Sequence, residues 1–413
     1  MSNTNADNRL SPLLINNIIY NISIYLTNSE IKQYRLVCKQ WNYTLLKLIG
    51  NNIKFNLKPN LTYLIEGRLL SLEVLSKSFI LDLRGLGGVI KGFEGEIWVN
   101  QEIFQGINDY FGNLRALDLM PPLNCMDKLS ECLPILNNLS SLTIRHRYLS
   151  QLNNLDQCNY YNLPSNISQI SLDYSNSTHL TYFPNLESSQ SLESIELIIN
   201  CTIKTKTELP FNALNNIKLF KTNQIDHKLS IQLLSLLNNL KSLDIQGKCP
   251  SQQVINNLSS QNQSLESINF TSHLSFNINS YNFSLFANLK ELRLNSKLSY
   301  TQLVQISNSC QNLQVLKFKL INFTNPICSL FESQFITLKY LDISECEFNW
   351  SVENKWKCSN KLEVLRVSEL RDLAVLDWFY NLRVLFIQRI NTKHLDYVRA
   401  KFGYLKFNWE KVI

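Results

Sequence analysis

The most regular feature of the chain is a six-residue pattern whose first, fourth and sixth residues are aliphatic or aromatic, while the residues between them are often polar. Leu289-Lys-Glu-Leu292-Arg-Leu294 is one example. Thirteen copies follow one another, and their first residues are 20 to 28 positions apart, 24 on average. These first residues are Leu114, Leu139, Ile167, Leu192, Leu214, Leu240, Leu265, Leu289, Leu313, Leu338, Leu362, Leu382 and Phe402. The pattern predicts a chain built from internal repeats.

Each copy ends in apolar residues that alternate with period two, which is the signature of a β-strand with one face in a core. We therefore expect one buried inner column that contains Leu117, Leu243, Leu292, Leu341 and Leu365. Between the copies, apolar residues have helical spacing; examples are Ile231, Leu233, Leu234, Leu237, Leu303 and Ile306. One repeat cannot cover its own apolar face, so neighbouring repeats must stack. The expected fold is an α/β solenoid, curved, with a parallel sheet on the concave face.

The leucine spacing and the period resemble those of leucine-rich-repeat proteins, whose repeats are 20 to 29 residues long. Cys346 is the best match to the Asn or Cys that this family has three positions after the last leucine. We assign residues 114–413 to the solenoid. Residues 51–113 contain the strand-like segments Ile53-Lys-Phe55, Leu81-Asp-Leu83 and Ile97-Trp-Val99, and we interpret them as degenerate repeats that open the solenoid. A separate small cap is the alternative for this segment.

The first fifty residues follow a different pattern. Residues 1–9 are polar, and we expect a disordered tail there. Ser11-Pro12 is a typical helix start, and Thr27-Asn-Ser-Glu30 is a capping-box pattern that opens a second helix. Spacings of four, four and three residues from Val37 to Leu48 predict a third helix. Residues 10–50 are therefore predicted to form three short helices.

This segment resembles an F-box. The matching parts are residues 14–26, Glu30-Ile31 and Arg35-Leu-Val-Cys-Lys-Gln-Trp41-Asn42, although Ile15 stands where the family has proline. The resemblance implies that the helices dock on a Skp-type adaptor and, through it, on a cullin. The residues implied in adaptor binding are Leu14, Ile18, Ile19, Ile22, Leu26, Ile31, Leu36, Val37 and Trp41. The alternative is that these side chains are only the core of a helical cap on the solenoid.

A candidate target-binding face lies in the last five repeats, where the concave positions change character. Earlier repeats have mostly small or polar residues there, such as Ser194, Ser242 and Ser267. The last five have apolar, aromatic and cationic residues instead, and the candidates are Val315, Lys317, Tyr340, Arg366, Phe386, Tyr404 and Lys406. Such side chains are typical of protein interfaces. The alternative is ordinary strand propensity, because valine and tyrosine favour strands.

Composition and charge exclude several other functions. Charged residues are 18% of the chain, and the net charge of +7 is spread without basic runs, so we expect no nucleic-acid partner. We expect no membrane span, because no uncharged apolar run reaches 18 residues. The five histidines and ten cysteines form no ligand motif or catalytic motif, so we expect no catalytic residue, no metal and no cofactor. The cysteines are expected to be reduced and mostly buried.

Together, the two resemblances imply a substrate-recognition subunit of an SCF-type E3 ubiquitin ligase, which is cytoplasmic and possibly nuclear. The F-box-like helices would dock on the adaptor, and the repeats would bind a target protein. Such a chain is not itself an enzyme, because it acts by holding a target near the conjugating enzyme. The alternative function is a leucine-rich-repeat scaffold for protein interactions, with a helical cap and no role in a ligase.

Overall fold

The computed structural model describes two compact units, Met1–Leu192 and Glu193–Ile413. The described residues are 56–57, 64–65, 68–69, 92–95, 99–121, 123–146, 158–175, 182–199, 209–211, 214–248, 250–261, 263–271, 286–319, 330–331, 333–344, 346, 361–369, 379, 381–390 and 406–412. The predicted three-helix domain at 10–50, its adaptor-binding residues and the tail at 1–9 lie outside them. Among the described helices, none is both long and apolar enough to cross a lipid bilayer.

In the first unit, a sheet of parallel strands is formed by β1, β4, β5, β6 and β8 in that order. The strands of this unit are β1 (Asn56–Leu57), β2 (Leu64–Ile65), β3 (Arg68–Leu69), β4 (Gly92–Gly95), β5 (Ala116–Leu119), β6 (Ser141–Arg145), β7 (Asn159–Asn162), β8 (Gln169–Asp173) and β9 (Tyr182–Asn185). Its helical segments are α5 (Gln101–Tyr110), η2 (Leu123–Lys128), α6 (Leu129–Cys132), η3 (Leu133–Ile135) and η4 (Leu186–Ser188). Two further pairs stand apart: β2 with β3, antiparallel, and β7 with β9, parallel.

The second unit is a longer stack of parallel strands in which each strand pairs with the next one along the chain. Its strands are β10 (Ser194–Ile198), β11 (Leu219–Gln224), β12 (Ser242–Lys248), β13 (Ser267–Phe270), β14 (Glu291–Lys297), β15 (Val315–Lys319), β16 (Tyr340–Ile343), β17 (Val364–Glu369), β18 (Val384–Ile390) and β19 (Lys406–Val412). Its helices are α7 (Lys228–Leu236), α8 (Gln252–Gln261) and α9 (Tyr300–Ser309). One strand per repeat in sequence order is the architecture of a leucine-rich-repeat solenoid.

The apolar residues of the repeats form buried columns inside this stack. Leu292 faces Ile268 on one side and Leu316 on the other, because the ladder pairs equivalent positions. The column in the second unit consists of Ile195, Phe220, Leu243, Ile268, Leu292, Leu316, Leu341, Leu365 and Leu385, each at most 1% exposed. In the first unit, Leu117 is 2% exposed and pairs with Leu142. The predicted burial of Leu117, Leu243, Leu292, Leu341 and Leu365 is confirmed. Each such side chain contributes roughly 1.5–3 kcal/mol.

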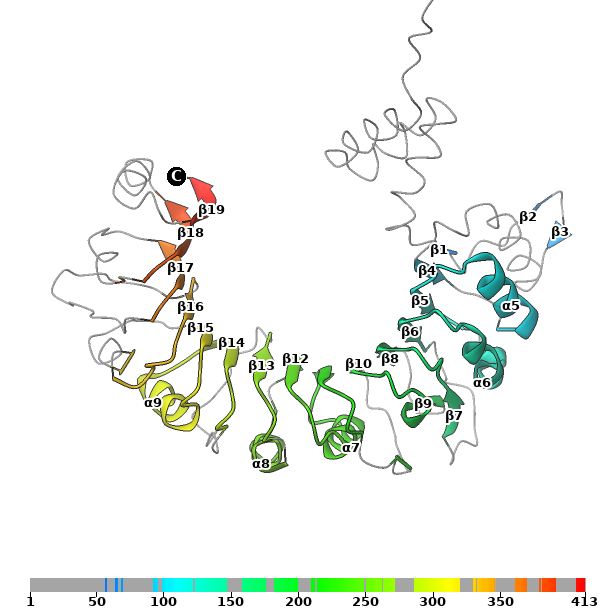
Figure 1. The fold of residues 1–413 in the computed structure, drawn as a ribbon, viewed down its shortest axis with the longest axis horizontal. Helices are drawn as coiled ribbons and strands as arrows, with labels where there is room; N and C mark the ends of the chain where they lie inside the picture. Colours follow the sequence, from blue (N-terminus) through cyan, green and yellow to red (C-terminus); the bar gives the residue numbers. More distant parts are fainter. Residues whose placement is uncertain are drawn as a thin grey trace, which may run out of the picture. The chain divides into compact units, whose positions relative to one another are not determined.

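In the described part of the second unit, the helices lie on one face of the strands, and no described helix lies on the other, which we call the open face (Figure 1). Figure 1 shows α7, α8 and α9 on the outer side of its strands. Helix α9 begins at a capping box, in which Ser299 Oγ accepts from Gln302 N and Gln302 Oε1 accepts from Ser299 N. Leu233, Leu234, Leu303 and Ile306 are buried, as their helical spacing predicts. Ile231 shares this helical spacing and lies within α7, but it is 39% exposed.

The register of two repeats differs from the prediction. In β11 it is Phe220 that pairs with Ile195 and Leu243, so this repeat starts at Ile217 and not at Leu214. The polar Thr222 fills the sixth position, and it is buried because its hydroxyl bonds with the Ser230 hydroxyl and accepts from Gln224 N. In β19 it is Phe407 that pairs with Leu385, so the last repeat starts two residues later than Phe402. A polar residue at an apolar position hid the first shift from the sequence pattern.

The strand before β5 also lies elsewhere than predicted. Strand β4 covers Gly92–Gly95 and pairs with β5 in register, so that Phe93 faces Leu117. The prediction of a strand at Ile97-Trp-Val99 is wrong for Val99, because this residue lies outside any strand. Val99 is buried just before α5. Asn100 caps that helix, because its Oδ1 accepts from Glu102 N at 2.7 Å. The cap places Val99 and Phe104 at the positions that often pack together as a hydrophobic staple.

Neighbouring repeats are also joined by side-chain hydrogen bonds just before the first leucine. The Asn288 amide donates to the Gln263 carbonyl at 2.7 Å, and the Asn312 amide donates to the Ala287 carbonyl at 2.7 Å. Asn138, Asn166 and Asn239 make the equivalent bond, and Ser264 and Thr337 donate from hydroxyls. We call this set the asparagine ladder. It satisfies carbonyls between the repeats that the strands do not pair.

Candidate protein-binding face

Two rows of side chains run across the open face of the second unit. The first row contains the residue before the second leucine of each repeat: Ser267, Glu291, Val315, Tyr340, Val364, Val384 and Lys406. The second row contains the residue two positions later: Asn269, Arg293, Lys317, Asp342, Arg366, Phe386 and Asn408. Five predicted target-binding residues, Val315, Lys317, Tyr340, Arg366 and Phe386, therefore lie on four neighbouring strands.

The first row has an apolar section on β15 to β18. Val315, Tyr340, Val364 and Val384 follow one another there, and each is partly exposed. We call these four residues the valine–tyrosine stripe. Parallel strands are about 4.8 Å apart, so the stripe is roughly 14 Å long. That length suits a short extended segment or one face of a helix in a partner protein.

Beside the stripe, aromatic and cationic side chains of the second row hold one another in place. The Arg366 guanidinium lies 5.9 Å from the centre of the Phe386 ring, within range of a cation–π contact. Burial and the nearby Asp342 carboxylate raise the pKa of Tyr340, while Arg366, which also hydrogen-bonds the phenol, and Arg293 lower it. The net pKa is raised, so the Tyr340 hydroxyl remains protonated and can donate a hydrogen bond at neutral pH.

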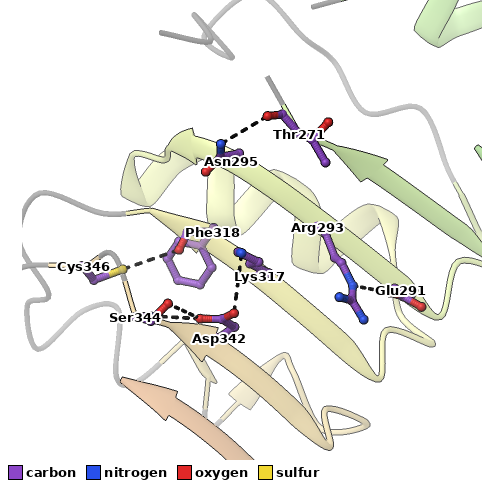
Figure 2. Close-up of polar contacts among 9 residues, drawn as sticks. All are labelled: Thr271, Glu291, Arg293, Asn295, Lys317, Phe318, Asp342, Ser344 and Cys346. Carbon is purple, nitrogen blue, oxygen red and sulfur yellow. Dashed lines mark hydrogen bonds and ion pairs between the residues drawn. The ribbon is translucent and has the colours of Figure 1, made fainter. Parts of the chain in front are cut away.

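Asp342 behaves differently from the rest of the second row. Its sequence position predicts an accessible carboxylate, but the residue is only 3% exposed. Its Oδ1 accepts from both the backbone nitrogen of Ser344 at 3.1 Å and the Ser344 hydroxyl at 2.7 Å. Its Oδ2 lies 3.8 Å from Lys317 Nζ. Figure 2 shows this carboxylate between Ser344 and Lys317. Aspartate commonly bonds backbone two residues on, and that turn removes Asp342 from the accessible face.

Lys406, one of the last two predicted target-binding residues, is not placed as expected. Lys406 pairs with Val384 and therefore belongs to the first row, whereas its predicted place was in the second row. Asn408 pairs with Phe386 and takes that second-row place. Both changes follow from the two-residue register shift of the last repeat. Tyr404 lies outside the described residues.

A hollow of about 320 Å³ on the same face was missed by the sequence pattern. It is lined by residues of β13, β14 and β15 and by Thr271, which follows β13: Asn269, Phe270, Thr271, Arg293, Leu294, Asn295 and Lys317. Figure 2 shows Arg293, Lys317 and Asn295 on these strands. The signal was present in the sequence, because Arg293 is a long cation at a second-row position one repeat before the predicted face begins.

In the earlier strands of the second unit, the charged side chains of the second row interact with one another. Glu196 and Lys221 form an ion pair of 2.6 Å. Burial raises the pKa of Asp244, Lys221 lowers it and Glu196 raises it, with a net increase. The Asn269 amide donates to the Asp244 carboxylate at 3.3 Å. These polar side chains interact with one another, so this part of the face has fewer groups available to bind a partner than β14 to β18.

Within the described part of the chain, the titratable groups do not form a reactive site. No three His, Cys, Asp or Glu side chains there could together hold a metal ion. Burial lowers the pKa of His146 to about 3, and its ring stacks on Tyr174 with centres 4.2 Å apart. Burial raises the pKa of Cys310 to about 12, so this thiol stays protonated at neutral pH. Cys346 is buried and its thiol lies 3.7 Å from the Phe318 carbonyl.

Comparison with known proteins adds little to this description. No protein-family model matches the chain, and no curated protein matches it in sequence. The structure of a TLR13–ssRNA13 complex covers 72% of this chain, with 12% identity and a TM-score of 0.39, and this chain spans 49% of that one. The structure of an internalin (inlF) from Listeria monocytogenes str. 4b F2365 covers 82% of this chain, and this chain covers 87% of that one. The identity is 14% and the TM-score is 0.30. The leucine-rich-repeat architecture therefore rests on the strand register and buried columns of the chain itself.

Proposed function

We propose that the protein binds a target protein on the open face of β14 to β18 and presents it to an SCF-type ubiquitin ligase through residues 10–50. The observation that carries the first half is the valine–tyrosine stripe beside Arg366 and Phe386. Partly exposed apolar residues flanked by arginine and aromatic side chains are typical of interface centres. The second half is supported by the F-box resemblance of the sequence.

Electrostatics of this face also favour a protein ligand. The second row offers Arg293, Lys317 and Arg366, while the carboxylate among them, Asp342, is buried against Ser344. An apolar stripe next to these cations is complementary to a segment that combines apolar and acidic side chains. Three cations are too few to neutralise a nucleic-acid backbone over several phosphates, so the chemistry of the face fits a protein segment better.

The ligase half of the proposal is tested by adaptor binding. We expect the full chain to bind a purified Skp-type adaptor, and we expect Leu14→Asp with Ile18→Asp to abolish this binding, because charged side chains do not fit an apolar groove. Phe386→Ala with Arg366→Ala is the matched control and should bind the adaptor like the wild type. The measurement is pull-down with the purified adaptor, together with a melting curve for each variant.

Adaptor binding also separates the two candidate functions. If the Leu14→Asp, Ile18→Asp variant still binds the adaptor, or if the wild type does not bind it, the F-box assignment is wrong. The protein would then be a scaffold for protein interactions whose N-terminal helices only cap the repeats. The target-binding role of β14 to β18 would stand in either case, because it depends on a separate surface.

A further inference from the structure

The hollow at β13 to β15 is positively charged where it faces solvent. Two long cations, Arg293 and Lys317, line it, and their side chains are 45% and 33% exposed. The carboxylates nearest to these cations, those of Glu291 and Asp342, do not line the hollow. The residues that line the hollow therefore include two cations and no carboxylate, which favours an anion there.

Both cations have hydrogen-bond donors to spare. Glu291 contacts Arg293 through the Nε atom, and within the described residues no hydrogen bond uses the two terminal guanidinium nitrogens. The ammonium of Lys317 is 3.8 Å from Asp342 Oδ2, which is too long for a hydrogen bond. Asp342 cannot readily move closer, because its other oxygen is held twice by Ser344. A guanidinium and an ammonium with available donors are the groups that bind carboxylate and phosphate oxygens most strongly.

The neutral walls of the hollow are fixed by bonds between repeats. The Asn295 amide donates to the Thr271 carbonyl at 3.2 Å, and Figure 2 shows this bond. The Thr271 hydroxyl donates to the Ile245 carbonyl at 3.4 Å, and the Asn269 amide donates to Asp244. These side chains donate hydrogen bonds to neighbouring repeats, so the walls are already ordered before a ligand binds.

The hollow adjoins the valine–tyrosine stripe on β15. Lys317 and Val315 lie two residues apart on β15 and so point to the same face of the sheet. At the other end, the Asp244 carboxylate lies beyond Asn269, which donates to it, and disfavours an anion there. A segment that lies on the stripe can therefore place one of its side chains in the hollow.

We infer that the hollow binds the carboxylate or phosphate group of an acidic or phosphorylated residue in the target segment. This inference rests on the proposed function, because it names the chemistry that the same face recognises. Arg293 contacts the anion through its terminal nitrogens, and Lys317 contacts it through Nζ. At about 320 Å³ the hollow is at the lower limit for ligand pockets, which suits one side chain and not a whole ligand.

Fluorescent peptide pools test this directly with the purified full chain. Each pool has a central phosphoserine, glutamate or serine, flanked by random positions rich in apolar residues. We expect the phosphoserine or glutamate pool to bind about tenfold more tightly than the serine pool. We expect Arg293→Gln with Lys317→Gln to lose this preference. Lys218→Gln with Lys290→Gln removes the same charge from exposed ion pairs elsewhere and should keep it. Lys317→Arg should keep it as well.

Each outcome has a defined meaning. A stronger preference for phosphoserine than for glutamate would identify phosphorylation as the source of the anion, and equal preference would identify any acidic side chain. The inference would be overturned if all three pools bind equally or if no pool binds. It would also be overturned if the preference for an anion survives the Arg293→Gln, Lys317→Gln change. Binding of every pool that is unchanged by Phe386→Ala with Arg366→Ala would instead overturn the proposed function.

Discussion

At the scale of single residues, local partners decide which polar groups of the open face remain accessible. Asp342 and Lys317 occupy equivalent positions on neighbouring strands, yet the Asp342 side chain is 4% exposed and the Lys317 side chain is 33% exposed. The difference comes from Ser344, which follows Asp342 by two residues and bonds its carboxylate. A repeat alignment treats each position alone, so it could not predict this burial.

His146 shows how strongly burial acts on one group. Its folded pKa is about 3, below the ordinary 6.5, so the unfolded chain takes up the proton first as the pH falls. The free energy of unfolding is therefore unaffected above pH 6.5 and decreases from there down to about pH 3. Between pH 7 and pH 5 this one residue should destabilise the fold by about 2 kcal/mol.

The prediction for His146 is tested by His146→Phe, which keeps a flat ring against Tyr174 and removes the titrating group. We expect the variant to lose about 2 kcal/mol less stability than the wild type between pH 7 and pH 5. Urea unfolding of both proteins at the two pH values measures this difference. Equal losses in the two proteins would show that His146 is not held neutral by burial.

At the scale of secondary-structure elements, the strands were largely predictable and their exact starts were not. The alternation of leucines placed β12 to β18 in register, since each of these strands begins two residues after the first leucine of its repeat. The pattern failed at β11, where Thr222 fills an apolar position, and at β19, where two overlapping alternations are present. In both strands the register is selected by side-chain chemistry and by pairing with the neighbouring strand, and the hydrophobic pattern alone does not show it.

The asparagine ladder was also invisible to the repeat pattern. The family's asparagine is expected after the last leucine, but here the amides lie just before the first leucine. The Asn239 amide donates to the Asn215 carbonyl, which is the equivalent acceptor only if that repeat starts at Ile217. The ladder and the strand pairing thus support the same corrected register.

The ladder makes a prediction about stability. Asn288→Ala should lower the free energy of unfolding by about 1 kcal/mol, because the Gln263 carbonyl loses its partner. Asn288→Thr should lose less, since Thr337 makes the equivalent bond with a hydroxyl one ladder step beyond Asn312. Denaturant midpoints of the two variants distinguish a specific bond from a general effect of substitution. Equal midpoints for the alanine and threonine variants would argue against the ladder.

At the scale of the whole molecule, core positions and surface positions alternate along the strands. The first, fourth and sixth positions of the repeats form the core, and the third and fifth positions face the open side. Substitutions on the open face should therefore change binding while leaving the melting temperature nearly constant. The sequence predicted the face at β15 to β18 from its residue types, but it missed the hollow at β13 to β15, because the change in residue type there is a single arginine.

The central claim is that the open face of β14 to β18 holds the target, and quantitative capture of partner proteins by the tagged full chain in cells tests it. Phe386→Ala with Arg366→Ala should reduce capture of the target about 30-fold. This factor corresponds to the roughly 2 kcal/mol of a typical hot spot, with the two side chains acting together as one anchor. Glu196→Ala with Lys221→Ala changes a charged pair on the same face of earlier strands and should leave capture unchanged. The account would be contradicted if the Glu196→Ala, Lys221→Ala variant loses the target while the Phe386→Ala, Arg366→Ala variant captures it fully.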